Sequence, residues 1–268
     1  SKLIYSKVKA RFGGDIKFFV SGGAPLSKEL AEFFAAVDIT ILEGYGLTET
    51  SPVLTCNSPT DLKFGCVGKP VENVDIKIAD DGEILAKGPN VMMGYYKNEE
   101  ETNKVFDQDG WFKTGDIGHI DEDGFLKITD RKKSLIVTSA GKNIAPAPIE
   151  IKLTSSSYIE QVHIIGDQRN FLTALIVPNF DSVIDYLKNI KNNISDPNAI
   201  VEHPDVIDLF NKEIEGAMVD FARFEKVKKF TLIPNLFSIE KGEMTPKMSI
   251  VRKEVEKNYS ELINKMYN

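Results

Sequence analysis

Two short apolar segments, each followed two residues later by a glycine, constrain the fold of this chain most strongly. Residues 16–20 precede Gly22 and Gly23, and residues 39–42 precede Gly44. Between the two segments, apolar residues recur at the spacing of an amphipathic helix. This order predicts a βαβ unit with two parallel strands, and therefore an α/β sheet. Because ligands of such sheets bind beyond the carboxyl ends of the strands, both glycine turns are candidate ligand-binding loops.

The helix between the two strands carries its own start signal and a clear apolar face. Ser27 is the predicted N-cap, because a serine side chain accepts hydrogen bonds from backbone N–H groups in the first turn. The apolar face comprises Leu30, Phe33, Phe34 and Val37. We expect this face to pack on the sheet.

The segment 43–50, Glu-Gly-Tyr-Gly-Leu-Thr-Glu-Thr, is the strongest candidate for a nucleotide site. Its glycines predict a turn whose side chains are exposed. Tyr45 is suited to stack on a base, Thr48 to donate to a phosphate, and Glu49 to bind Mg²⁺ as a hard oxygen ligand. A polar surface turn without function is the alternative interpretation of the same residues.

From about residue 65 the pattern changes to short strands separated by turns, which predicts an antiparallel β section. Predicted strands cover 74–78 and 83–88, and a hairpin pairs 117–120 with 125–129. Asp116 lies where this hairpin begins. A carboxylate there can accept hydrogen bonds from both hydroxyls of a ribose, although turn aspartates without function are also common.

A charged break predicts two domains. We expect a first domain over 1–129, a hinge over 130–134, and a small α+β domain over 135–268 with a helical insertion at about 181–222. In the second domain, Gly141 marks a hairpin tip. The predicted strands and helices of the second domain are as follows: a helix opened by Pro146 and Pro148, strands over 162–166, 171–177 and 228–233, helices over 181–190 and 204–222, and a terminal helix with Val251, Val255, Tyr259, Leu262 and Met266 on one face.

Composition excludes several classes of protein. With 33 basic and 40 acidic residues the net charge is −7, which disfavours a nucleic-acid-binding surface. No long apolar run predicts a membrane span, which leaves peripheral membrane contact open, and we expect a cytoplasmic protein. Cys56 and Cys66 are expected to be free thiols, and the three histidines, at 119, 163 and 203, are too scattered to predict a zinc site.

Taken together, the ordered motifs resemble those of the adenylate-forming superfamily. They comprise residues 21–25, 44–50 and 111–116, then Asp130-Arg131, with Gly141 further on. From about residue 15 to its end, the chain resembles the carboxyl-terminal part of a long-chain fatty acyl-CoA synthetase. The implied fold is the carboxyl-terminal portion of a large adenylation domain, with part of a parallel sheet and an antiparallel β section, followed by a small α+β lid domain.

The resemblance implies a two-step ligation. Such enzymes use ATP and magnesium to join a fatty acid to AMP, and then transfer the acyl group to coenzyme A. Two alternatives stay open: a fatty acyl-AMP ligase or adenylation domain that passes the acyl group to a carrier protein, and a nucleotide-binding or structural fragment without turnover. The acyl-chain length and the oligomeric state are not indicated by the sequence.

The resemblance also assigns roles to individual residues of the first domain. Gly22, Gly23 and Ala24 would line the adenine and acyl pocket. Tyr45 would stack on adenine, with Glu43 and Gly44 among the nucleotide-binding residues. These assignments continue with Thr48 near the α-phosphate, Glu49 on magnesium, Asp116 on the ribose hydroxyls and Arg131 beside the ribose and phosphate.

Three further assignments concern the hinge and the second domain. Lys133 matches the hinge position, and the loop that bears Gly141 would line the pantetheine channel. The family's catalytic lysine lies three residues before the arginine that corresponds to Arg252, and Ser249 occupies that position here. Lys247 is the candidate substitute, although a residue two places along an element points elsewhere.

The family's phosphate loop, a Ser/Thr/Gly-rich segment that ends in lysine, has no match in the chain. We expect it, with much of the acyl tunnel, to lie upstream of residue 1. A triphosphate would then lack its cradle, so the chain by itself is expected to lack the full reaction.

Overall fold

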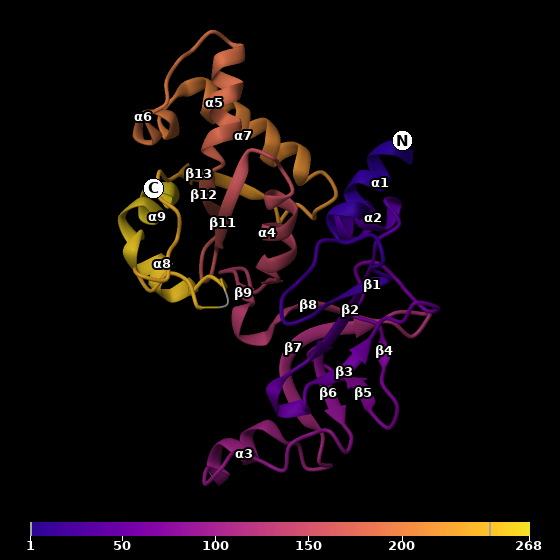
Figure 1. Ribbon diagram of the computed structural model, residues 1–268. Coiled ribbons are helices and arrows are strands. Elements are labelled where there is room, and N and C mark those ends of the chain that lie inside the picture. The colour runs from indigo at the N-terminus through magenta and orange to yellow at the C-terminus, as the bar shows by residue number, and fades with distance from the viewer. Residues whose placement is uncertain (1, 247) are drawn as a thin grey trace. The chain divides into compact units, whose positions relative to one another are not determined.

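The computed structural model describes residues 2–246 and 248–268, with side chains from residue 5 onward (Figure 1). The chain divides into two compact units, Ser1–Lys133 and Ser134–Asn268. The division falls inside the predicted hinge segment 130–134. Lys247, one of the predicted catalytic residues, lies outside the described residues.

The first unit contains the predicted βαβ arrangement, preceded by a helix, α1, that was not predicted. Strands β1 and β2 pair in parallel, with Phe18 opposite Thr40 and Ser21 opposite Glu43, and the helix between them starts at the predicted cap, where Ser27 Oγ accepts from Leu30 N at 3.1 Å. The sheet order is β1-β2-β3-β4. The elements of this part are α1 (Lys2–Arg11), β1 (Phe18–Ser21), α2 (Lys28–Ala36), β2 (Thr40–Gly46), η1 (Thr48–Thr50), β3 (Val53–Cys56) and β4 (Lys69–Pro70).

Strand β2 is longer than predicted, and this corrects the interpretation of segment 43–50. The glycines do not end the strand, because β3 returns antiparallel and gives them ladder partners, with Gly44 opposite Cys56 and Gly46 opposite Val53. The turn is the short 3₁₀ segment η1 instead. As a result Glu43 and Tyr45 are buried strand residues, not exposed turn residues.

The predicted apolar face of α2 is only partly covered. Val37, just after the helix, is buried, but Leu30 is 45% and Phe33 57% exposed. The expectation that the whole face packs on the sheet is therefore wrong for these two side chains within the described residues. Strand β1 is an edge strand of its sheet, so the sheet offers the helix only limited surface.

A second, antiparallel sheet completes the first unit, as predicted. Its order is β5-β6-β7-β8, and its inner face joins β2 and β3 in one core that includes Tyr45, Leu54, Ile84 and Leu126. The elements are β5 (Asp75–Ile78), β6 (Glu83–Lys87), α3 (Glu99–Val105), β7 (Phe112–Ile120), β8 (Leu126–Arg131) and η2 (Lys132–Ser134). The predicted charged break is thus the end of β8 followed by a 3₁₀ turn.

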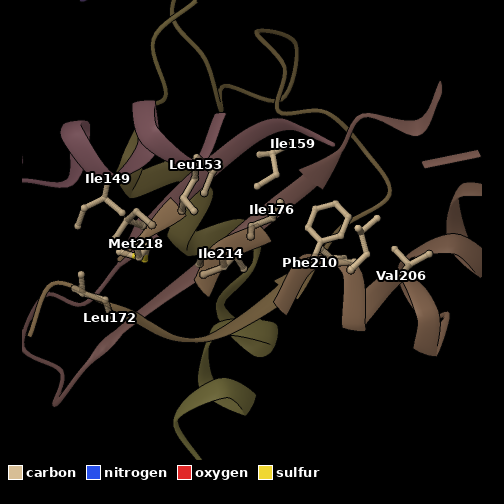
Figure 2. Close-up of a cluster of buried hydrophobic side chains, with 14 of the residues drawn as sticks. Ile149, Leu153, Ile159, Leu172, Ile176, Val206, Phe210, Ile214 and Met218 are labelled. Atoms are coloured by element: carbon tan, nitrogen blue, oxygen red, sulfur yellow. The ribbon is translucent and has the colours of Figure 1, made fainter. Parts of the chain in front are cut away.

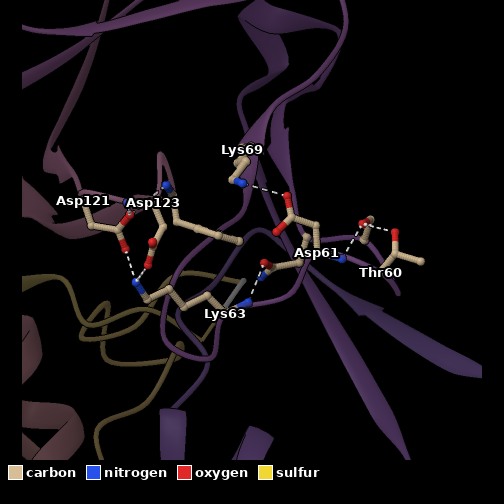
Figure 3. A network of polar contacts seen from close by, with 9 residues as sticks. Thr60, Asp61, Lys63, Lys69, Asp121 and Asp123 are labelled. Atoms are coloured by element: carbon tan, nitrogen blue, oxygen red, sulfur yellow. Dashed lines mark hydrogen bonds and ion pairs between the residues drawn. The ribbon is translucent and has the colours of Figure 1, made fainter.

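Polar contacts tie the segment before β4 to the β7–β8 turn (Figure 3). Lys63 Nζ lies 2.7 Å from Asp121 Oδ2 and 2.6 Å from Asp123 Oδ2. On the same face, Lys69 Nζ lies 2.8 Å from Asp61 Oδ2. Because these ion pairs are at least partly exposed, they fix the loop's position more than they add stability.

The second unit is an α+β domain whose sheet is covered on both faces. The middle strand β12 alternates: Leu172, Ala174 and Ile176 face one core, whereas Leu175 and Val177 face the other. Figure 2 shows the first core, where Phe210 and Ile214 of α7 meet Ile176 and the α4 residue Leu153. The sheet has the order β11-β12-β13. The elements of the second unit are β9 (Ile136–Val137), β10 (Asn143–Ile144), α4 (Pro146–Thr154), β11 (Ile159–Ile165), β12 (Leu172–Pro178), α5 (Phe180–Asn189), α6 (Pro197–Val201), α7 (Pro204–Ala217), β13 (Val227–Leu232), α8 (Arg252–Asn258) and α9 (Ser260–Tyr267).

Several details of the second unit differ from the prediction, including the end of α7 at Ala217 instead of 222. The turn-rich segment after α5 contains a short helix, α6, which Asp196 caps and Pro197 opens. The terminal helix is two helices, because the backbone leaves helical geometry at Tyr259 (φ −107°, ψ 19°). This break changes the phase of the apolar face, so Ile263 is buried beside Met266. Among the described residues, no helix is long and apolar enough to span a membrane.

Candidate functional site

The turn after β2 is built by tight backbone packing. A Cβ atom on Gly46 would lie 1.7 Å from the carbonyl oxygen of Pro52, so only glycine fits there. Leu47 N donates to Pro52 O at 3.0 Å, and Thr50 Oγ1 accepts from Leu47 N at 2.9 Å. The closed turn leaves Thr48 exposed and Glu49 half-buried, at the end of the strand where the sequence predicts a ligand.

Tyr45 and Asp116 meet in the interior although 71 residues separate them in the chain. The Tyr45 phenol donates a 2.7 Å hydrogen bond to Asp116 Oδ2, and both residues are buried. Burial raises the pKa of the Asp116 carboxyl, whereas the Tyr45 hydrogen bond and the nearby charges of Arg131 and Lys133 act in the opposite direction. Burial, and then the Asp116 charge, raise the pKa of the Tyr45 phenol.

Arg131 joins this pair from the neighbouring strand. It lies opposite Asp116 in the β7–β8 ladder, and its Nε is 3.5 Å from Asp116 Oδ1. The arginine side chain remains 63% exposed, so most of its donors are available to a ligand. Tyr45, Asp116 and Arg131, three of the predicted nucleotide-binding residues, therefore form one cluster.

The predicted roles of these three residues remain predictions. Tyr45 is 9% exposed and belongs to the hydrophobic core of the unit, so little of its ring is open for stacking. Asp116 uses Oδ2 for the phenol and directs Oδ1 toward Arg131, and a carboxylate oxygen can accept more than one hydrogen bond. This arrangement is chemically suited to a ribose diol.

Glu49 faces an open cleft of about 420 Å³ within the first unit. Its Oε1 accepts a 2.9 Å hydrogen bond from the Tyr95 phenol, and its backbone carbonyl accepts from Met92 N at 2.7 Å. The cleft is lined by Leu47, Glu49, Glu83, Tyr95, Lys104, Val105, Phe112, Lys113, Thr114, Gly115 and Lys132. Lysines and carboxylates thus face the same space, which is suited to phosphate groups and a metal ion.

The donor set of Glu49 fits Mg²⁺ when substrate phosphates share the ion. Magnesium in nucleotide sites takes one or two carboxylates plus phosphates and water. Among the described residues there is no group of three histidine, cysteine, aspartate or glutamate side chains that could hold a metal ion. Glu49 is therefore suited to share a metal with a nucleotide.

The Gly22–Gly23 turn lies beside Gly44 of strand β2. A Cβ on Gly22 would be 3.3 Å from Gly44 O, and Gly23 has φ +81°, a conformation that favours glycine. Gly22, Gly23 and Ala24 are exposed. Glu43 is buried at the end of the β1–β2 pairing, and burial raises the pKa of its carboxyl, an effect that a hydrogen bond from the Gly65 backbone partly offsets.

The hinge and pantetheine residues are found in separate units. Lys133 is exposed at the end of the first unit. Gly141 occupies the turn between β9 and β10 in the second unit, with φ +72° and its N–H donated to Thr138 O at 2.8 Å. Ser249, at the family's lysine position, is exposed.

Tyr95 and Glu83 are among the cleft residues that were not predicted from the sequence. Tyr95 comes from the loop before α3, and Glu83 from the start of β6. Glu83 Oε1 accepts from Gly115 N at 3.0 Å, directly beside Asp116. The one sequence signal for Glu83 is an acidic residue at the head of an otherwise apolar strand, where a buried carboxylate requires partners.

Comparison with known proteins identifies the family. Residues 2–96 match the family described as AMP-binding enzyme, and residues 133–268 match the AMP-binding enzyme C-terminal domain. The chain belongs to the AMP-binding enzyme family. The predicted resemblance to adenylate-forming enzymes is confirmed, as is the fold class of an adenylation domain's carboxyl-terminal portion.

Individual relatives show how much of such a protein is present. The chain is 41% identical over 268 residues to the long-chain-fatty-acid–CoA ligase FadD15 of Mycobacterium bovis. The match covers 100% of this chain and 44% of that relative. The A-PCP didomain of a carboxylic acid reductase from Segniliparus rugosus, solved with AMP, superposes with a TM-score of 0.76 at 25% identity, over 99% of this chain and 37% of that one.

A third comparison comes from a structure with metal and nucleotide. O-succinylbenzoate coenzyme A synthetase from Bacillus subtilis, solved with ATP and magnesium ion, superposes with a TM-score of 0.67 at 25% identity, over 93% of this chain and 50% of that one. The AMP-binding enzymes that this chain resembles are thus about twice its length.

Proposed function

We propose that this chain forms the carboxyl-terminal part of an ATP-dependent long-chain fatty acid–CoA ligase. The observation that carries the proposal is the buried Tyr45–Asp116 pair with Arg131 beside it, in a chain 41% identical to a long-chain-fatty-acid–CoA ligase. The proposed substrates are a long-chain fatty acid, ATP and coenzyme A. The proposed setting is lipid metabolism in the cytoplasm, where free thiols such as Cys56 and Cys66 persist.

In the first step, a carboxylate oxygen of the fatty acid attacks the α-phosphorus of ATP, and the bond to pyrophosphate breaks. Asp116 would accept hydrogen bonds from the ribose hydroxyls and so fix the nucleotide, while the exposed guanidinium of Arg131 would donate to phosphate oxygens. Mg²⁺ held by Glu49 and the phosphates would neutralise charge that gathers on the reacting phosphate. Thr48 would donate to an α-phosphate oxygen.

In the second step, the sulfur of coenzyme A attacks the acyl carbon of the acyl-adenylate, the carbon–oxygen bond to AMP breaks, and the thiol proton is released. Lys133 would act as the hinge between the half-reactions, and the turn that bears Gly141 would line the channel for the pantetheine arm. Both roles are part of the proposal, and the match to the AMP-binding enzyme C-terminal domain supports them.

The test is AMP release by the full-length gene product that contains this chain. With ATP, magnesium, palmitate and coenzyme A, we expect AMP and palmitoyl-CoA in equal amounts, and neither product when magnesium is chelated. If AMP is released without palmitoyl-CoA and the acyl group is instead found on a carrier protein's pantetheine thiol, the carrier protein is the acyl acceptor in place of coenzyme A. No AMP with fatty acids of any length would overturn the proposal.

A further inference from the structure

Glu83 divides its two carboxylate oxygens between two functional segments of the first unit. Oε1 accepts from the backbone N–H of Gly115 at 3.0 Å, and Oε2 accepts from Lys132 Nζ at 2.8 Å. The residue is 6% exposed. A buried carboxylate is stable only with such partners, so both segments are held by the same side chain.

The first of these segments is an irregularity in strand β7. In the β6–β7 ladder, Glu83 pairs with Ile117 but Leu85 pairs with Lys113. This stretch of β7 is therefore two residues longer than the stretch of β6 that it pairs with. Such bulges remove ladder hydrogen bonds and redirect side chains. Here the bulged residues include Gly115, with φ +73°, and Asp116.

Side chains replace the missing ladder bonds at the bulge. Thr114 Oγ1 donates to Ile84 O at 2.8 Å and accepts from Asp116 N at 3.1 Å. The Gly115 N–H would otherwise lack a ladder partner, and Glu83 supplies one. The orientation of Asp116, the proposed ribose ligand, therefore depends on the two polar anchors Glu83 and Thr114.

The second segment is the 3₁₀ turn η2, inside the predicted hinge. Lys132 Nζ lies 2.6 Å from Asp81 Oδ2 as well as 2.8 Å from Glu83 Oε2, and these two carboxylates raise the pKa of Lys132. The preceding residue, Arg131, pairs with Asp116. Consecutive cations of the hinge segment thus bind Asp116 and the carboxylate that positions it.

We propose that Glu83 is a positioning residue that holds the Gly115–Asp116 bulge for the ribose diol of a nucleotide and couples the ribose site to Lys132 in the hinge segment. This inference rests on the proposed function only in taking Asp116 as the ribose ligand. Ribose binding reduces the motion of the bulge. Because Glu83 also binds Lys132, the motion of the hinge segment is reduced as well. Release of Lys132 leaves Glu83 bound to the Gly115 N–H, so the bulge is retained while the hinge segment loses its link to the ribose site.

The first test measures nucleotide affinity by calorimetry on the full 268-residue chain, with AMP and 2′,3′-dideoxy-AMP as probes. Glu83→Ala should weaken the binding of AMP about 3- to 10-fold, the effect of about one lost hydrogen bond. The affinity for 2′,3′-dideoxy-AMP should be unchanged. Glu83→Gln keeps an acceptor for Gly115 N and should retain AMP affinity within about 2-fold. Glu72→Ala, an exposed acidic position, is the matched control.

The second test measures the coupling by amide hydrogen exchange over residues 130–134. AMP should slow exchange there in the wild type, but not in Glu83→Gln or Lys132→Met, which each remove the ion pair and keep the acceptor for Gly115 N. Thermal unfolding of each variant checks that the fold is retained.

Several outcomes would overturn the inference. If Glu83→Ala weakens the binding of both nucleotides equally, Glu83 has only a structural role. If AMP still slows exchange of the hinge amides in Glu83→Gln, the ribose site and Lys132 are not coupled through Glu83. Failure of wild-type chain to bind AMP would overturn the ribose role itself. AMP binding that shows the predicted Glu83 dependence, in a gene product that releases no AMP with any fatty acid, would sustain this inference while the proposed function fails.

Discussion

The phenol of Tyr95 donates a 2.9 Å hydrogen bond to Glu49, the predicted magnesium ligand. The loop that carries Tyr95 is fastened to the same turn by backbone and side-chain contacts: Met92 N donates to Glu49 O, and Asn90 Nδ2 donates to Thr50 O at 2.9 Å. Tyr95 N also donates to Thr102 Oγ1 at 2.9 Å. These contacts hold Glu49 in one orientation before any ligand arrives, which lowers the cost of ordering it on binding.

The first prediction follows for Tyr95→Phe in the full-length gene product. Loss of the phenol should raise the magnesium concentration for half-maximal AMP formation about 3- to 10-fold and leave the rate at saturating magnesium nearly unchanged. A magnesium titration of AMP release measures both quantities. Tyr96→Phe, at a neighbouring side chain that is 88% exposed, is the control. An unaltered magnesium requirement would exclude Tyr95 from positioning Glu49.

The second prediction concerns Glu49 itself. Glu49→Ala should reduce ATP–pyrophosphate exchange by about 100-fold or more, because the metal would lose its protein carboxylate. The fold should be retained, since Glu49 is only half-buried and its backbone contacts do not depend on its side chain. Exchange at the wild-type rate would remove Glu49 from the mechanism, whatever the stability of the variant.

Local signals were sufficient for much of the fold. Ser27 caps its helix through a contact only three residues away, and the turn over 121–124 follows from Asp121 Oδ1, which accepts from Phe125 N at 2.9 Å. The helix opened by Pro146 likewise begins where predicted. Such features depend on neighbouring residues, so the sequence carries their whole cause.

The polar contacts of the site could not be predicted from the sequence, because they join residues that are far apart in the chain. Tyr95 meets Glu49 across 46 residues, and Glu83 meets Gly115 across 32. Periodicity indicates that a strand exists but not which strand pairs with it or in what register, and the β7 bulge shifts that register. For the same reason β3 was missed, and with it the burial of Tyr45.

The third prediction uses the raised pKa of Asp116. Because its pKa is higher in the folded state than in the unfolded state, its contribution to stability is present below the ordinary value of 3.8 and is lost as pH rises through the folded-state value. Asp116→Asn has no such proton to lose. Urea unfolding of the chain between about pH 3 and pH 7 should therefore show the variant gaining stability relative to wild type as pH rises.

A matched control for this titration is Asp75→Asn, at an exposed position on β5. Its stability relative to wild type should not follow the Asp116 pattern. A constant difference between Asp116→Asn and wild type across the pH range would contradict the buried carboxyl as the cause.

The fourth prediction concerns His163, which is fully buried; among the described residues, neither of its ring nitrogens has a hydrogen-bond partner. Nε2 lies 3.4 Å from Glu256 Oε1 and Nδ1 lies 3.8 Å from Glu150 Oε1, while Arg252 pairs with Glu150 and Phe237 packs edge-on against the ring. Burial lowers the pKa of His163 despite the two carboxylates, and Arg252 adds to the effect. Burial therefore favours the neutral form of the imidazole.

Because the folded-state pKa of His163 is below the ordinary 6.5, its contribution to stability is present above that value and is lost as pH falls through the folded-state pKa. His163→Leu should be about as stable as wild type, or up to about 2 kcal/mol more stable, at neutral pH, because two unpaired polar atoms are removed. Its advantage should grow in acid. Urea midpoints measure this, with the exposed His119→Gln as control; an advantage that shrinks in acid would show that the histidine is charged in the fold.

The last prediction addresses the missing lysine in the second unit. Ser249 closes a tight turn in which Thr245 N donates to Ser249 O at 2.8 Å and Ser249 N donates to Thr245 Oγ1 at 3.2 Å. Met248 has φ +61° in this turn. These contacts use only the Ser249 backbone, and its side chain is exposed, so a lysine fits there without disturbing the turn.

In the full-length gene product, Ser249→Lys should raise the rate of ATP–pyrophosphate exchange about 10-fold or more, because a cation would reach the charge that develops on the α-phosphate. Thioester formation from added acyl-adenylate should be unchanged. Ser249→Met supplies length without charge and should have no effect. If Lys247 is the natural substitute, Lys247→Ala should slow ATP–pyrophosphate exchange in the wild type but not in Ser249→Lys. Equal slowing in both backgrounds would mean that residues 247 and 249 do not share a role.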